Sequence, residues 1–171
     1  MPSPSVLEHS NSLTHPLAPA ALLAIARELA RDASTWRALA RHHPDERWFV
    51  RLAEHDAYDV WLIGWDSHQG VDLHDHGGSA GALYVVAGEL VEHRSNPAGI
   101  GRPLRRVLRE FDDRPMPPAH IHEIANESVT VAASIHVYSP PLAIMHHFEI
   151  EHEAELRMIR REVVGAQPSG T

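Results

Sequence analysis

In the N-terminal part of the chain, hydrophobic residues follow a helical spacing. Over residues 19–43, apolar side chains recur every three or four positions, which predicts one or two amphipathic helices that end before Pro44. Residues 45–54 are expected to form a further short helix, with Asp45 as its N-cap. The sequence therefore predicts helices within residues 19–54.

After residue 56 the pattern changes to short segments rich in β-branched and aromatic residues. Turn-forming Gly, Pro, Asp and Asn residues separate these segments. About seven strands at this spacing are typical of an antiparallel sandwich or barrel. We therefore expect a mainly β fold, with N-terminal α-helices followed by a β-barrel over residues 57–164. The predicted strands are 57–65, 81–94, 104–111, 119–126, 129–139, 143–150 and 155–164.

The chain is expected to form a single domain over residues 19–164. Its 171 residues match the usual size of one domain. Hydrophobic residues make up 43% of the chain, which is enough for a packed core. Residues 1–18 are rich in Pro, Ser, His and Asn and are expected to form a flexible N-terminal tail. Residues 165–171 are expected to form a C-terminal tail.

Charge and cysteine content exclude several classes of function. The formal charge of −8 argues against a nucleic-acid partner, which needs a basic surface. The absence of cysteine excludes disulfides, iron–sulfur clusters, thiolate zinc sites and a cysteine nucleophile. One arginine cluster is expected to form the solvated face of a strand, with a local anion patch as the alternative. It comprises Arg102, Arg105, Arg106 and Arg109.

No segment of the chain is typical of a targeting or membrane sequence. Residues 1–19 lack the basic start and the apolar run of a signal peptide. No stretch approaches the roughly 18 apolar residues that a transmembrane helix needs. We therefore expect a cytoplasmic protein without a membrane partner.

Histidine is the unusual residue of this composition, with 15 copies. Imidazole is the commonest metal ligand in proteins. His74 and His76 are two positions apart, so on a strand both side chains lie on one face and can chelate one metal. His120 and His122 have the same spacing. Four other histidines are expected to be solvated: His93, His146, His147 and His152.

A further polar pattern lies on a predicted strand near residue 135. Ser134, His136 and Tyr138 occupy alternate positions, so their side chains project to one face. This geometry suits a hydrogen-bonded relay that ends in a phenol. A core strand with incidental polar residues is the alternative. Three hydrogen-bonding groups are poor core filler, however, unless they satisfy one another.

Two blocks of the sequence resemble the signature motifs of the cupin superfamily. The first motif runs H-x-H, three or four residues, Glu, six residues, Gly. The chain has HDHGGSAGALYVVAG, with Gly81 in place of the Glu. The second motif runs P-x-G-x-x-H-x-x-x-N, and the chain has PPAHIHEIAN, with Ala119 in place of the Gly. This resemblance implies a cupin-type barrel and selects His122 rather than His120 as the third metal ligand, which leaves His120 outward-facing or behind the ligands.

Together with the string SIHVYSPP, these blocks resemble the cysteine dioxygenase family in its bacterial form, over residues 45–145. The resemblance implies that the chain oxidises L-cysteine to cysteine sulfinic acid with O2 at a non-heme Fe(2+) ion. Loss of the motif carboxylate would leave positions on the metal open for substrate and dioxygen. The implied iron ligands are His74, His76 and His122, and the implied relay at the catalytic site is Ser134, His136 and Tyr138.

The resemblance also implies a substrate-binding arginine. In this family an arginine just before the first core strand pairs with the substrate carboxylate. Arg51 is expected to fill this role beside Tyr138, with Arg47 as the alternative, because a guanidinium binds a carboxylate with two parallel hydrogen bonds. Trp65 matches a family tryptophan, and Ser139–Pro140 matches a peptide bond that is cis in the family.

Two departures from the family pattern leave alternatives open. Animal members carry a cysteine at the position of Gly81, cross-linked to the active-site tyrosine, so Tyr138 is expected to be unmodified. Related dioxygenases that prefer 3-mercaptopropionate carry glutamine in place of the arginine. The alternatives are a dioxygenase for another small thiol, a zinc hydrolase or isomerase, and a metal-binding cupin without catalysis. We expect a monomer or a small homo-oligomer.

Overall fold

The computed structural model describes residues 15–95, 103–151 and 155–165. Most of the predicted N-terminal tail and nearly all of the predicted C-terminal tail lie outside these residues. Arg102 and His152, which the sequence analysis placed on the surface, also lie outside the described residues.

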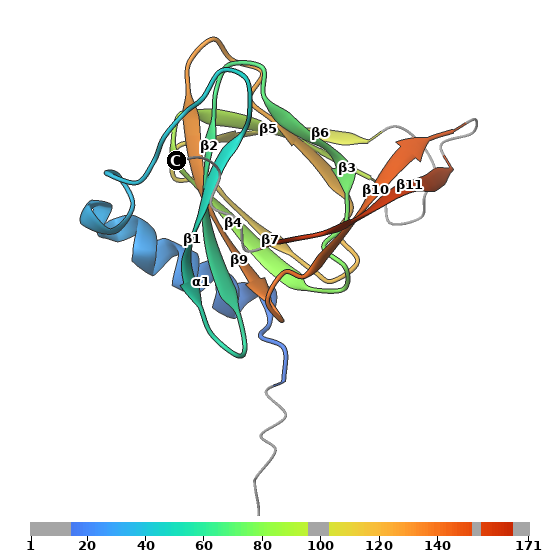
Figure 1. The fold of residues 1–171 in the computed structure, drawn as a ribbon, viewed down its shortest axis with the longest axis horizontal. Coiled ribbons are helices and arrows are strands. Elements are labelled where there is room, and N and C mark those ends of the chain that lie inside the picture. Colours follow the sequence, from blue (N-terminus) through green and yellow to red (C-terminus); the bar gives the residue numbers. More distant parts are fainter. Residues whose placement is uncertain (1–14, 96–102, 152–154, 166–171) are drawn as a thin grey trace, which may run out of the picture.

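Two antiparallel sheets curve around a common interior and form a barrel (Figure 1). All strand pairs described are antiparallel, which confirms the predicted mainly β class. The five-stranded sheet has the order β1 (Trp48–Glu54), β2 (Asp59–Trp65), β9 (Ala132–Ser139), β4 (Ala80–Ala87), β7 (Asp113–Met116). The six-stranded sheet has the order β11 (Leu156–Val163), β10 (Ile144–Ile150), β3 (Gly70–His74), β8 (His122–Ala125), β5 (Glu89–Arg94), β6 (Leu104–Arg109).

The helix α1 (Pro19–Arg31) lies on the outer face of the five-stranded sheet (Figure 1). Proline at its first position suits a helix start, because its φ is already helical and it has no N–H to leave unpaired. Leu22, Leu23 and Ala26 are buried in the cluster between this helix and the sheet. A short 3-10 helix, η1 (Ala33–Thr35), follows. Among the described residues, no helix is long and apolar enough to cross a membrane.

Strand β9 is buried on both faces because the helix covers one of them. Ile135 and Val137 pack in the cluster under α1, whereas Tyr138 packs in the cluster inside the barrel. Because side chains alternate along a strand, Ser134 and His136 also face the interior. The helix thus buries the apolar outer face and leaves polar side chains on the inner face.

The helix predicted over residues 45–54 is wrong, because Trp48–Glu54 forms strand β1 and pairs with β2. Val50 packs in the cluster under α1, and Phe49 packs in the cluster inside the barrel. A short apolar segment can fit either a helix or a strand, so its pairing with β2 decides the conformation. Asp45 consequently caps no helix.

Three further differences concern the strands. The predicted strand 81–94 is divided into β4 and β5 at Gly88, whose φ of 73° is readily adopted only by glycine. Strand β3 was not predicted, and β7 lies in a segment predicted as a turn. β7 tolerates Pro115 because it is the edge strand of its sheet, where a missing N–H interrupts no ladder.

The described members of the arginine cluster, Arg105, Arg106 and Arg109, lie on β6, as predicted. Arg105 and Arg109 are exposed and pair with the carboxylates of Glu127 and Glu89. Ion pairs of this kind at the surface contribute little to stability. The described part of the cluster is therefore a solvated strand face.

Gly64 of β2 is expected to be critical for stability. A Cβ atom at this position would lie 1.9 Å from the backbone carbonyl oxygen of Arg41, which crosses the strand there. Neither backbone can yield easily, so we expect Gly64→Ala to lower the free energy of unfolding by about 3 kcal/mol. Chemical denaturation measures this change. An unaltered midpoint and slope would contradict the close approach.

Candidate active site

Three buried imidazoles converge inside the barrel. His74 ends β3 and pairs in register with His122 at the start of β8, and His76 follows His74 by two residues. Nitrogen atoms of the three side chains lie within 4.8 Å of one another. All three side chains are buried. The structure therefore brings together the three histidines that the sequence proposed as metal ligands.

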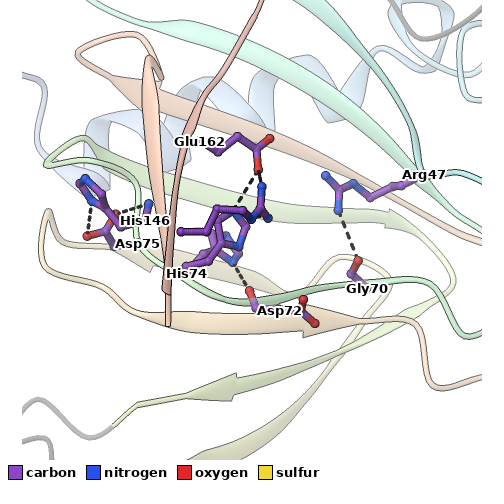
Figure 2. Close-up of polar contacts among 9 residues, drawn as sticks. Arg47, Gly70, Asp72, His74, Asp75, His146 and Glu162 are labelled. Atoms are coloured by element: carbon purple, nitrogen blue, oxygen red, sulfur yellow. Dashed lines mark hydrogen bonds and ion pairs between the residues drawn. The ribbon is translucent and has the colours of Figure 1, made fainter. Parts of the chain in front are cut away.

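The hydrogen bonds of these imidazoles leave nitrogen atoms available for a metal. His74 Nδ1 donates to the carbonyl oxygen of Asp72 at 2.8 Å (Figure 2). His122 Nδ1 donates to the carboxylate of Glu92 at 3.0 Å. Neither nitrogen of His76 has a hydrogen-bond partner among the described residues. Because an unpaired buried polar group is costly, this donor set fits a bound transition metal.

Burial keeps these imidazoles neutral. It lowers the pKa of His74, His76 and His122, and the neighbouring imidazoles lower the pKa of His74 and His76 further. The neutral form is the one that binds a metal, so protons compete little near pH 7. Three neutral ligands also leave the full charge of a divalent ion in place, which favours an anionic ligand at the remaining positions.

A second group, Glu92 with His120 and His122, also has potential ligand atoms within 4.8 Å of one another. Hydrogen bonds account for this group without a metal, since Glu92 Oε1 accepts from both imidazoles. Arg114 Nε lies 2.6 Å from Glu92 Oε2, where its charge would repel a cation. The outward-facing position considered for His120 is wrong, because its side chain is 2% exposed and bound to Glu92.

Glu92 is a residue that the sequence analysis missed. Burial alone would raise the pKa of Glu92, but the hydrogen bonds from His120 and His122 and the charge of Arg114 hold it well below its usual range. The carboxylate therefore stays ionised. A signal was present in the sequence, because Glu92 shares a strand face with the fully buried Leu90, and a charge at a core position needs a partner.

Ser134, His136 and Tyr138 form a continuous relay of hydrogen bonds. Ser134 Oγ lies 2.9 Å from His136 Nε2, and His136 Nδ1 lies 3.0 Å from the Tyr138 hydroxyl oxygen. Trp65 Nε1 donates to Ser134 Oγ at 2.9 Å and is the first donor of the relay. The three side chains that the sequence placed on one strand face are thus mutually satisfied, and Trp65 anchors them.

The direction of the relay follows from which groups can donate. Ser134 Oγ accepts from Trp65, and among the described residues His136 is the partner left to receive the serine hydrogen. His136 then carries its hydrogen on Nδ1 and donates to the oxygen of Tyr138. Burial lowers the pKa of His136 to about 3 and raises the pKa of Tyr138. The Tyr138 O–H therefore stays protonated and is free to donate to a ligand.

Gly81 gives the Tyr138 ring its space. The two residues pair in register across β4 and β9, and a Cβ at Gly81 would lie 3.0 Å from a carbon of that ring. The ring is centred 5.0 Å from the ring of His76. A side chain at Gly81 would therefore crowd the phenol ring. The next peptide bond along β9, Ser139–Pro140, is cis, as the resemblance implied.

A cavity of about 90 Å³ borders the imidazoles of His74 and His122 and the relay residues His136 and Tyr138. Its size suits a small molecule of a few non-hydrogen atoms, and most of its wall is aromatic or aliphatic. Arg47 and Glu162 are the charged residues among those that line it. The lining residues are Arg47, Phe49, Trp61, Ile63, Trp65, Val71, His74, His122, Ile124, His136, Tyr138, Leu142, Met145, Glu162 and Val164.

Arg47 lines this cavity, and its donors are only partly used. Its guanidinium lies over the Trp65 ring, 5.5 Å from the ring centre, and Nη1 donates to the carbonyl of Gly70 at 3.3 Å (Figure 2). Its Nε is buried without a partner among the described residues, and burial lowers its pKa. A partly buried cation with free donors is suited to bind a carboxylate.

Arg51, the arginine favoured in the sequence analysis, is not among the residues that line the cavity. It forms an ion pair with Glu54, and its guanidinium stacks over Trp61 at 4.6 Å from the ring centre. Its charge is thus already paired. The structure therefore favours Arg47, the alternative, as the arginine that can meet a ligand.

His147 is buried, contrary to the expectation that it is solvated. It is 3% exposed and pairs in register with His74 of the candidate metal site. Its Nε2 lies 3.0 Å from the carboxylate of Glu162. This contact joins β10 to β11 beside the cavity. His146 is half-buried and pairs with Asp75 (Figure 2). Sequence spacing could not find these contacts, because they join separate strands.

Comparisons with known proteins give the family model and the fold relatives of this chain. Residues 20–151 match the family model described as cysteine dioxygenase type I. A protein structure from Thermus thermophilus has a TM-score of 0.54 at 22% identity, covering 61% of this chain and 93% of its own. A double-stranded β-helix protein from Klebsiella pneumoniae has a TM-score of 0.53 at 16% identity, and the match covers 72% of this chain and 93% of that protein. A cupin superfamily protein from Desulfitobacterium hafniense has a TM-score of 0.52 at 16% identity, covering 61% and 87%. These structures confirm the cupin-type fold.

Proposed function

This chain belongs to the cysteine dioxygenase type I family, and from this premise we propose that it is a ferrous thiol dioxygenase that converts L-cysteine to cysteine sulfinate with dioxygen. One observation carries the proposal. Arg47, whose buried Nε has no partner among the described residues, lines the same small cavity as two imidazoles of a three-histidine centre. A substrate with a carboxylate and a thiol can meet both groups at once.

His74, His76 and His122 would hold the ferrous ion. Three neutral nitrogen ligands also suit zinc, so the choice of iron rests on the family. Ferrous iron supplies the one-electron chemistry through which dioxygen can react with a thiol. The protein contributes a dry, neutral ligand set that favours binding of an anionic thiolate.

Arg47 would bind the substrate carboxylate. Its planar guanidinium presents parallel donors to a carboxylate, and partial burial strengthens this contact. The small cavity favours a free amino acid over a thiol within a peptide. The position of the arginine would therefore set which end of the substrate meets the metal centre.

Tyr138 would orient the substrate and dioxygen through its free O–H. His136, Ser134 and Trp65 hold the phenol in one orientation, and its raised pKa keeps it a donor. In the complete reaction both oxygen atoms end on sulfur, and the thiol proton is released. The electrons that sulfur loses are those that dioxygen gains, so no further reductant is needed.

Tyr138→Phe is expected to lower kcat by roughly 10–100-fold, because one positioned hydrogen bond is lost at the reacting groups. The bound iron should stay unchanged, since Tyr138 is not a ligand. Initial rates of oxygen uptake and metal analysis measure the two effects. Tyr84→Phe is the matched control, because Tyr84 packs outside the barrel near α1. Loss of iron in Tyr138→Phe, or an unchanged kcat, would contradict the assigned role.

Oxygen uptake by the iron-loaded protein tests the proposed function. With L-cysteine we expect uptake and a product heavier by two oxygen atoms, which mass spectrometry detects. A preference for 3-mercaptopropionate would keep the chemistry and change the substrate. Uptake with neither thiol, despite bound iron, would overturn the proposal. Activity with zinc and without oxygen would instead indicate a hydrolase or isomerase.

A further inference from the structure

We propose that Glu92 is the positioning residue of the metal centre, and that it holds His122 in the tautomer and orientation a metal ligand needs. His120 and Arg114 support Glu92 in this role. The inference rests on the proposed metal centre, but it does not depend on the substrate or on catalysis.

Glu92 joins segments from both sheets of the barrel. It is completely buried in β5, and its Oε1 accepts from His122 Nδ1 at 3.0 Å and from His120 Nε2 at 2.8 Å. Its Oε2 lies 2.6 Å from Nε of Arg114, which belongs to β7 of the other sheet. A buried carboxylate is tolerated only with such partners. These contacts therefore fix the position of the Glu92 carboxylate.

The contact with Glu92 leaves His122 one nitrogen for a metal. Because Nδ1 carries the hydrogen that Glu92 accepts, only Nε2 has a free lone pair. The same contact holds the plane of the ring, and the negative charge of the carboxylate makes the imidazole a stronger electron donor. Glu92 would therefore raise metal affinity without binding the metal.

His122 is the one proposed ligand with a charged partner among the described residues. His74 donates to a backbone carbonyl, and His76 has no hydrogen-bond partner among them. The position where the first cupin motif has its carboxylate is occupied by Gly81. The carboxylate of this centre thus stands behind a ligand rather than among the ligands. A purely structural ion pair between Glu92 and Arg114 would not require the two imidazole donors.

Binding of Co(2+) to the metal-free protein under anaerobic conditions tests this role. We expect Glu92→Gln to raise the Kd by roughly 10–100-fold, the usual effect of losing an outer carboxylate partner. Competition with a chelator, followed by the visible absorption of Co(2+), measures the Kd. Glu89→Gln is the matched control, since Glu89 also lies on β5 but is paired with Arg109 at the surface. Its Kd should stay within about twofold.

A Glu92→Gln variant that folds and binds Co(2+) within about twofold of the wild type would overturn the inference. A structural role alone would lower the unfolding temperature of the metal-free protein and leave the Kd unchanged. If this variant does not fold, nitrogen NMR of the wild-type protein loaded with Zn(2+) decides. The inference requires His122 to carry its hydrogen on Nδ1, and metal bound through Nδ1 would overturn it.

These measurements need no oxygen, no iron and no thiol. If the iron-loaded wild type takes up no oxygen while Glu92→Gln has a raised Kd for Co(2+), the proposed function is removed and the inference is supported. If the wild type takes up oxygen while Glu92→Gln has an unchanged Kd, the proposed function is supported and the inference is overturned. Wild-type protein that binds no Co(2+) would overturn the inference together with the metal centre.

Discussion

His122→Ala is expected to abolish tight metal binding. The variant removes one of three proposed ligands, and the buried carboxylate of Glu92 also loses a donor. We expect the Kd for Fe(2+) or Co(2+) to rise by more than the roughly 100-fold that loss of an outer partner can cause. Metal analysis after dialysis, together with a chelator titration, measures this loss.

His120→Ala is the informative comparison for this result. His120 contacts Glu92 and is not grouped with His74 and His76, so its loss should weaken metal binding by only about tenfold. His55→Ala, at an exposed position, serves as the control. If His122→Ala kept its metal while His120→Ala lost it, the choice of the third ligand would be wrong.

Arg47→Ala is expected to lower kcat/KM for L-cysteine by roughly 10–150-fold. A charge-assisted hydrogen bond to a buried carboxylate contributes about 1.5–3 kcal/mol, which corresponds to this range. Most of the change should appear in KM, because Arg47 would bind the part of the substrate that does not react. Iron content should stay unchanged, since Arg47 is not a ligand. Oxygen-uptake kinetics over a range of cysteine concentrations measure both parameters.

Arg51→Ala is the matched control for this experiment. It removes the same side chain four residues further along the segment, where the charge is already paired with Glu54. We expect kcat/KM to change by less than about threefold, as for most changes away from a binding site. A large loss in Arg51→Ala with little change in Arg47→Ala would restore the assignment made from the sequence.

The candidate site concentrates groups that lower the stability of the protein without a ligand. His76 is buried with neither ring nitrogen paired among the described residues, and Arg47 carries a charge into an apolar wall. Each arrangement is costly for folding. Such local conflicts are expected where a ligand completes the interactions. A metal and an anionic substrate would satisfy these two groups.

The relay could be predicted from the sequence because its three residues lie on one strand, and the first two proposed metal ligands because they are close together in the chain. Ser134, His136 and Tyr138 alternate along β9, and alternation alone puts them on the same face. His74 and His76 are two positions apart, and His74 ends β3 while His76 lies just beyond it. Pairing with another strand could not change which side chains face together.

The arginine could not be chosen from the sequence. Arg47 and Arg51 are four residues apart, a spacing that keeps them on one face in a helix and in a strand. The local sequence pattern therefore cannot distinguish Arg47 from Arg51. Pairing of β1 with β2 places Arg51 opposite Trp61 and leaves Arg47 over Trp65 at the cavity. Arg47 therefore lines the cavity, whereas Arg51 does not, although both lie on the same face.

The sequence by itself determined the mainly β class, the cupin-type motifs and the shared face of the relay residues, because these follow from local spacing along the chain. The tertiary structure decided what meets across strands. His147 pairs with His74 because β10 lies beside β3 in the same sheet, and Glu92 of β5 contacts His120, which lies just before the neighbouring strand β8. Glu92 also contacts Arg114, which belongs to the other sheet. Such contacts join residues far apart in the chain, and a local period carries no information about them.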